Sequence, residues 1–175
     1  MSSPFNVVKI EKERVSQVPI NSATSFNSGD MMKWDPVNLV ATPIVAGDAA
    51  NATSAANFIG VSNDTNPITS LGQTLGGSGA LASGLPPRIA IITRGMCLFT
   101  VDDNATYFPG DAVTFGADPQ KVRKTGASGG AIIGYVAPEN SFSVSGGATQ
   151  GIVATANVTQ ILVNLQPAFT KLATL

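Results

Sequence analysis

The sequence carries little charge for a soluble protein. Charged residues make up 12% of its 175 positions, about half of the roughly 25% that is usual. A monomer of this composition would expose mainly small, uncharged side chains, which give little electrostatic protection against association. We therefore expect other subunits to cover much of the surface. The formal net charge of −1 provides no basic field, so neither nucleic acid nor an acidic membrane is an expected partner.

The residue types of common active sites are also scarce. The chain has no histidine, which is the commonest general base and metal ligand. Its single cysteine, Cys97, excludes an internal disulfide and lies among apolar residues, where a buried role is expected. Residues 77–82 have glycines at the spacing of a dinucleotide fingerprint, but Pro86 and Pro87 follow in place of a helix. We expect no enzymatic activity, no cofactor and no metal ion.

Long hydrophobic segments are absent from the sequence. No apolar run approaches the roughly 20 residues of a membrane-spanning helix, so no membrane association is expected. The first residues, MSSPFN, lack a basic start followed by an apolar stretch. That pattern predicts no signal peptide.

One pattern is present twice. Residues 26–34 read FNSGDMMKW and residues 107–115 read YFPGDAVTF. Each copy has an aromatic residue, a Gly-Asp pair three positions later, and apolar residues two and four positions after the aspartate. A second matching piece follows each copy, FIGV at residues 58–61 and IIGY at residues 132–135. Alternating apolar residues after a turn predict strands, because alternate side chains of a strand share one face. We predict an all-β fold, either two related modules or one barrel of two similar halves.

The Gly-Asp pairs are predicted to be structural turns. Gly29 and Gly110 would supply a backbone conformation with positive φ, and Asp30 and Asp111 would accept backbone N–H hydrogen bonds within the turn. Two metal sites with no further ligands would explain the repetition less well. The sequence therefore favours a structural role for all four residues.

Two other charged groups have a structural and a chemical interpretation. Asp102 and Asp103 could act as paired carboxylates or calcium ligands, but neighbours followed by an asparagine fit a hairpin turn better. Residues 121–124 (KVRK) could contact phosphate or an acidic neighbour. The alternation favours Lys121 and Arg123 on the solvent face of a strand, with Val122 facing inward.

The chain divides into three parts by composition. Residues 1–25 are predicted to be an N-terminal arm with concentrated charge, in which Lys9, Lys12 and Arg14 are candidate partner contacts. The β domain spans residues 26–140 and contains an uncharged, glycine-rich loop at 65–87, which cannot pack on its own side chains. Residues 141–175 are predicted to be a C-terminal extension with a final strand. Within the β domain, the glycine after Arg94 predicts a bulge or bend.

These motifs resemble those of the small capsid decoration, or cement, proteins of tailed bacteriophages. The resemblance is carried by residues 29–35 (GDMMKWD), 58–61 (FIGV) and 93–95 (TRG) and covers roughly residues 26–140. It implies a small β-barrel or β-tulip domain, here with an extended arm and a long glycine-rich loop. The glycine-rich loop and the region from residue 141 depart from the compact pattern of that group.

The resemblance implies a structural protein on the exterior of a virion. Such a protein would be made in the host cytoplasm, bind the outside of an assembled capsid and stabilise contacts between major capsid protein subunits. The low charge and the uncharged loop at 65–87 predict a homo-oligomer, a trimer first and a dimer second. The alternatives are another β-barrel virion component, such as a tail, baseplate or minor head protein, or a carbohydrate-binding module.

Overall fold

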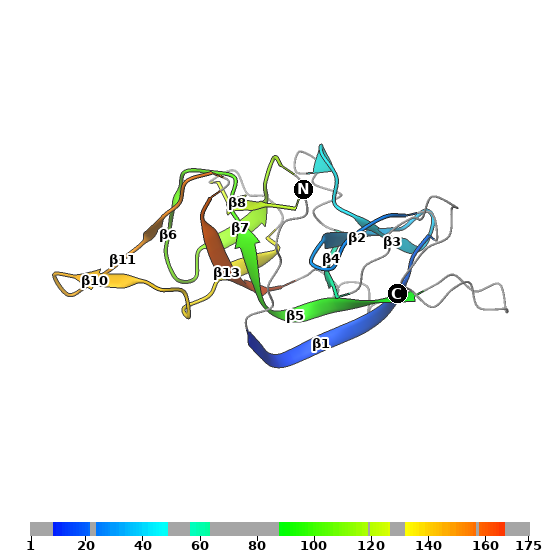
Figure 1. The fold of residues 1–175 in the computed structure, drawn as a ribbon, viewed down its shortest axis with the longest axis horizontal. Helices are drawn as coiled ribbons and strands as arrows, with labels where there is room; N and C mark the ends of the chain where they lie inside the picture. The colour runs from blue at the N-terminus through cyan, green and yellow to red at the C-terminus, as the bar shows by residue number, and fades with distance from the viewer. Residues whose placement is uncertain are drawn as a thin grey trace.

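The computed structural model describes residues 9–21, 24–48, 57–63, 88–118, 120–126, 132–156 and 158–166. Every helix or strand element in these residues is a strand (Figure 1), which confirms the all-β prediction. The strands are β1 (Lys9–Pro19), β2 (Met31–Asp35), β3 (Val40–Pro43), β4 (Phe58–Ser62), β5 (Arg88–Thr100), β6 (Thr106–Tyr107), β7 (Ala112–Phe115), β8 (Val122–Lys124), β9 (Gly134–Val136), β10 (Ser143–Ser145), β11 (Ala148–Gln150), β12 (Ile152–Val153) and β13 (Gln160–Leu165).

Most of these strands form one curled antiparallel sheet. Its order is β3-β2-β4-β5-β13-β9-β7-β8, and β1 pairs with β5 outside this path. Strand β5 is long and serves both ends of the sheet: its first half pairs with β1 and β4, and its second half pairs with β13. The two halves meet at Gly95, which has a φ of 139°, and β5 bends along its length in Figure 1. The bend lies where the Arg94-Gly95 pair predicts one.

The two copies of the sequence pattern make the same strand pairings. Strand β2 pairs with β3 and β4, and β7 pairs with β8 and β9. The register is also the same, since Met32 lies opposite Gly60 in the first copy and Val113 lies opposite Gly134 in the second. The predicted repeat therefore corresponds to a repeated three-stranded arrangement.

The repetition extends to the strands on either side. Strand β1 pairs with the first half of β5 in the same way that the second half of β5 pairs with β13. An isolated parallel bridge then joins Ile20 to Ala41, and a corresponding bridge joins Val101 to Val122. Each bridge brings the end of the first strand back to the second strand of the hairpin. The chain is thus built from two five-stranded, barrel-like units that share β5.

We call these the first unit (β1 to β4 and the first half of β5) and the second unit (the second half of β5, β7, β8, β9 and β13). Their interiors are filled at matching positions. The buried side chains inside the first unit are Val18, Ile20, Phe26, Met32, Ala41, Ile59, Ile89 and Ile91. Their counterparts in the second unit, in the same order, are Phe99, Val101, Tyr107, Val113, Val122, Ile133, Ile161 and Val163. Burial of these sixteen side chains gives each unit its own apolar core.

The glycine in each FIGV-like piece is required by close packing. A Cβ atom on Gly60 would lie 2.2 Å from the carbonyl oxygen of Ile92 on β5. A Cβ atom on Gly134 would lie 2.4 Å from the carbonyl oxygen of Asn164 on β13. The glycines therefore allow β4 and β9 to approach the last strand of their units.

The fold differs from the predicted division into arm, domain and extension. Residues 9–19 of the expected arm form β1 in the sheet, and both Val18 and Ile20 are buried in the first unit. The sequence did not predict this strand, because residues 9–14 are mostly charged and show no clear alternation of apolar residues. The expected C-terminal extension contributes β13, which lies between β5 and β9. Boundaries at residues 26 and 141 therefore cut through the units.

Candidate interaction surface

Both Gly-Asp pairs form the same turn. Gly29 and Gly110 have φ values of 95° and 84°. The carboxylate of Asp30 accepts the N–H of Asn27 at 2.7 Å, and that of Asp111 accepts the N–H of Phe108 at 2.8 Å. Burial raises the pKa of Asp30, and the hydrogen bond from Asn27 opposes that shift. These aspartates hold the turns that begin β2 and β7.

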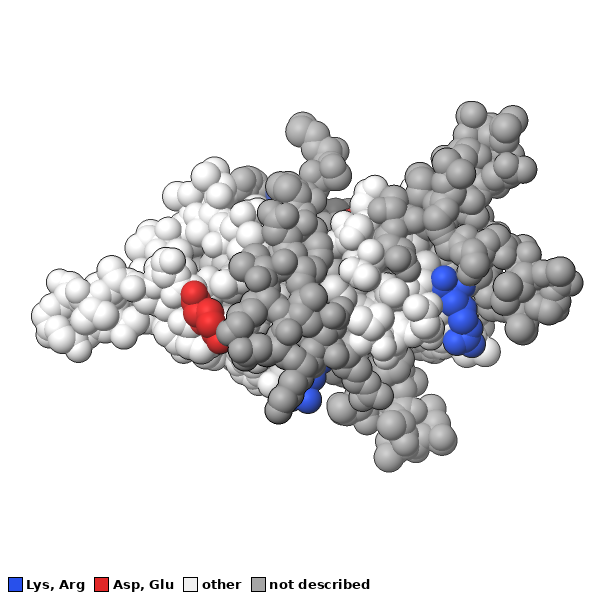
Figure 2. All heavy atoms as spheres, turned by 60° about the horizontal axis from the view of Figure 1, so that its bottom comes forward, with Lys and Arg blue, Asp and Glu red and all other residues white. Residues whose placement is uncertain are grey.

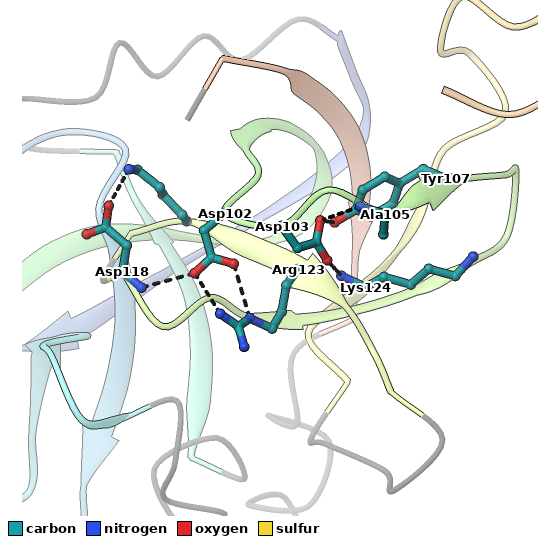
Figure 3. Close-up of polar contacts among 8 residues, drawn as sticks. Asp102, Asp103, Ala105, Tyr107, Asp118, Arg123 and Lys124 are labelled. Atoms are coloured by element: carbon teal, nitrogen blue, oxygen red, sulfur yellow. Dashed lines mark hydrogen bonds and ion pairs between the residues drawn. The ribbon is translucent and has the colours of Figure 1, made fainter. Parts of the chain in front are cut away.

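The paired aspartates are joined to a network inside the second unit (Figure 3). Asp102 receives two hydrogen bonds of 3.1 Å from the guanidinium of Arg123 and one of 3.0 Å from the N–H of Asp118. The pKa of Arg123 is raised chiefly by its bond to Asp102. Asp102 is thus held by internal donors, which indicates a structural role. The predicted hairpin turn at this pair is wrong, because β5 and β6 on either side of it do not pair with each other: β5 pairs with β13 and β6 with β12.

The second carboxylate of the pair is held just as firmly. Asp103 accepts the hydroxyl of Tyr107 at 2.7 Å and the N–H of Lys124 at 2.9 Å. Burial raises the pKa of Tyr107 above its ordinary value, and the bond to Asp103 adds to that shift. The first unit has Phe26 at the position of Tyr107, and Pro43, which lacks an N–H, at the position of Lys124. The network therefore belongs to the second unit.

The basic segment at residues 121–124 is neutralised within the fold. Lys121 pairs with Asp118, Arg123 with Asp102, and Lys124 with Asp111 at 2.6 Å. Val122 is fully buried in the core of the second unit, so it faces inward as the alternation predicts. With a carboxylate beside each cation, the segment offers no free basic cluster for phosphate.

The described residues contain no group of three or more aspartate, glutamate, cysteine or histidine side chains arranged to hold a metal ion. In the same residues, no helix is long and apolar enough to cross a membrane.

The most distinctive surface is formed by the segment that follows β9 and precedes β13 in the sequence. We call residues 140–159 the insertion; its β10–β11 hairpin projects from the second unit, and every residue of the two strands is exposed. The insertion has no charged residue, and Figure 2 shows the projection without a charged side chain. Three of its valines are largely exposed: Val144 at 69%, Val153 at 72% and Val158 at 77%. Val144 lies on the projecting hairpin and Val153 lies in β12. A projection without charge can contact a partner without desolvating charged groups, so we take it as the candidate interaction surface.

The insertion is anchored to the second unit at its base. Ile152 and Val153 in β12 pair with β6, and the buried Ala154 donates its N–H to the carbonyl of Ala105 at 3.0 Å. Asn140 donates to the carbonyl of Leu162 and accepts its N–H, at 2.9 Å and 2.8 Å. The projecting hairpin therefore has a fixed base.

Sequence reasoning proposed other residues as partner contacts. Lys9, Lys12 and Arg14 lie in β1, and their side chains are outside the described part of the chain. The glycine-rich loop at 65–87 also lies outside the described residues. The exposed valines of the insertion were missed. Their signal in the sequence is a valine within a segment of mainly small and polar residues that has no charge.

Comparison with known proteins does not assign the chain to a family: no protein-family model matches it, and no curated protein gives a significant match.

Proposed function

We propose that the chain is a structural, non-enzymatic protein of a phage particle. It binds the outer surface of an assembled capsid and stabilises contacts between major capsid protein subunits. It is made in the host cytoplasm and acts on the virion exterior. The proposal rests on the motif resemblance of residues 29–35, 58–61 and 93–95 to capsid decoration proteins and on the insertion.

The observation that carries the proposal is the uncharged, exposed β10–β11 hairpin on a base of paired strands. Such a hairpin can bury apolar side chains and backbone groups against a flat partner without desolvating charge. One hairpin offers a small contact area. A lattice that presents many equivalent sites to an oligomer converts weak contacts into stable attachment.

A protein with the proposed function would stabilise the capsid by binding alone, without catalysing a reaction. A protein that binds only the assembled lattice shifts the equilibrium toward assembly by mass action. The internal pairing of Asp102 with Arg123 and of Asp103 with Tyr107 supports a scaffold role for these polar groups. A decoration protein requires such a scaffold and a docking surface.

A co-sedimentation assay tests the proposal. Purified protein is mixed with assembled shells that lack it and, separately, with unassembled major capsid protein. We expect it to sediment with the shells and not to bind the unassembled subunits. A variant in which residues 143–150 are replaced by two glycines should bind the shells more weakly. Wild-type protein that stays in the supernatant with shells would contradict the proposal.

A further inference from the structure

The two units contact each other through non-equivalent parts of the same structure. The first unit buries an outer face, outside its own core, against the second unit. The side chains of this covered face are Met31, Ile44, Phe58, Val61 and Ile92, which belong to the same apolar cluster as the second unit's core. The ring of Phe58 packs edge-on against Phe115 of β7, with centroids 5.5 Å apart.

The hairpin between β7 and β8 fastens this contact. The side-chain amide of Gln120 inserts where the ladder between β2 and β3 opens. Its oxygen accepts the N–H of Met31, and its nitrogen donates to the carbonyl of Ile44 at 2.9 Å. Gln120 has a φ of 68°. The second unit therefore contacts the first through the β7–β8 hairpin, which carries Gln120, and through the ring of Phe115.

The first unit has the same hairpin between β2 and β3, and here it is exposed. Leu39 occupies the position of Gln120 and also has a positive φ, 56°. Leu39 is 62% exposed and Val37 is 86% exposed. Positive φ is strained for leucine, so an apolar side chain is held in solvent at a conformational cost.

The second unit likewise has a face that corresponds to the covered face, and part of it is exposed to solvent. Ile132 occupies the position of Phe58; Phe58 is 1% exposed, whereas Ile132 is 41% exposed. Thr125 occupies the position of Ile44, and its hydroxyl is buried with no hydrogen-bond partner among the described residues. Tyr135, at the position of Val61, is half-buried. We call Thr125, Ile132 and Tyr135 the open face.

We propose that copies of this chain associate head to tail, with the β2–β3 hairpin of one copy docked on the open face of the next. The contact would repeat between chains the apolar packing that joins the two units within a chain, without the hydrogen bonds of the Gln120 amide, because Leu39 stands in its place. Trp34, at the position of Phe115, would pack against Ile132 of the neighbour. A contact of this type is heterologous, so it closes into a ring or continues as a filament.

The composition of the open face sets the strength of this association. Threonine and tyrosine replace the isoleucine and valine of the covered face, so the interface between chains is more polar than the one between units. Association is therefore expected to be reversible and dependent on concentration. The inference does not rest on capsid binding, because it follows from the packing of the two units.

Sedimentation velocity of the full chain from micromolar to millimolar concentration tests the inference. Wild-type protein should form oligomers as its concentration rises. Leu39→Asp and Ile132→Asp should each weaken association at least about tenfold, the effect of losing one central apolar contact. Val15→Asp is the control, because Val15 on β1 is 44% exposed, close to Ile132, and lies in neither proposed surface; this variant should associate as wild type does.

Two further samples separate folding from association and identify the geometry. Leu39→Gly removes the side chain at a position where glycine is unstrained, so it should fold at least as stably as wild type and still associate weakly. An equimolar mixture of Leu39→Asp and Ile132→Asp should form dimers and nothing larger, because each retains one intact surface. A wild-type chain that stays monomeric, a Leu39→Gly chain that associates normally, or a mixture that stays monomeric would overturn the inference.

Discussion

Substituting the glycines of β4 and β9 tests the close approach of β4 to β5 in the first unit and of β9 to β13 in the second. In Gly134→Ala the added Cβ would lie 2.4 Å from the carbonyl oxygen of Asn164 and 2.7 Å from the side chain of Val163. The obstructing oxygen belongs to the backbone of β13, which is paired on both sides and cannot shift freely. Overpacking of this kind costs about 1–3 kcal/mol of unfolding free energy.

Gly60→Ala should cost more than Gly134→Ala. Its Cβ would lie 2.2 Å from the carbonyl oxygen of Ile92, and Gly60 also has a φ of 140°. Strained backbone adds about 1–3 kcal/mol to a packing cost of similar size. The expected loss is therefore about 2–6 kcal/mol.

Gly126→Ala is the matched control, because no atom lies within 4 Å of its Cβ position and its φ is not in the positive region. Alanine at such a site is neutral or stabilises by about 0.4–1 kcal/mol through the unfolded state. Urea unfolding followed by far-ultraviolet circular dichroism gives all three values. Equal stability of Gly134→Ala and Gly126→Ala would refute the close packing of β9 against β13.

Three other predictions concern the turn, the network and β1. Gly110→Val should lower the unfolding free energy by about 1–3 kcal/mol through backbone strain alone, since its Cβ would meet nothing within 4 Å; an unchanged urea midpoint would exclude a strained turn. Tyr107→Phe should cost about 1.5–3 kcal/mol, the value of a hydrogen bond to a charged group, because Asp103 loses its hydroxyl donor. The pKa of Tyr107 is raised in the folded state. The stability that the protonated hydroxyl contributes is therefore complete below the ordinary tyrosine pKa of about 10 and is lost as pH rises above it. Urea midpoints of wild type measured from pH 8 to 11 should fall, and those of Tyr107→Phe should fall less. Deleting residues 1–20 should lower the melting temperature sharply, because it removes β1 and two buried side chains worth about 1.5–3 kcal/mol each; unchanged melting would show that β1 is dispensable.

Local patterns predicted much of the fold. The doubled Gly-Asp and Ile-Gly pieces identified β2, β4, β7 and β9, because a turn followed by alternating apolar residues leaves few other structures. The bend near Gly95 was also visible, since glycine within an apolar run marks a bulge or close approach. Such signals depend on neighbours in sequence.

The features that the sequence did not predict depend on pairing between residues far apart in the chain. The charges at residues 9–14 suggested an arm, but β1 is a strand because its backbone pairs with β5 and its last residues fill the first unit. The repeat is wider than its motifs because matching core positions need only be apolar: Ala41 corresponds to Val122, and Phe26 to Tyr107. Leu39 and Ile132 are exposed because the second unit covers the first and, in the described part of the chain, no unit covers the corresponding surfaces in return. No local sequence pattern indicates this arrangement.

The most direct test of the proposed function is the amount of this chain in purified phage particles. Quantitative mass spectrometry of particles gives its copy number relative to the major capsid protein, and labelling with a reagent that does not enter the shell gives its side. The account predicts a copy number comparable to that of the major capsid protein and labelling on the exterior. A chain that is absent from the particles, or present in only a few copies at the tail, would contradict it.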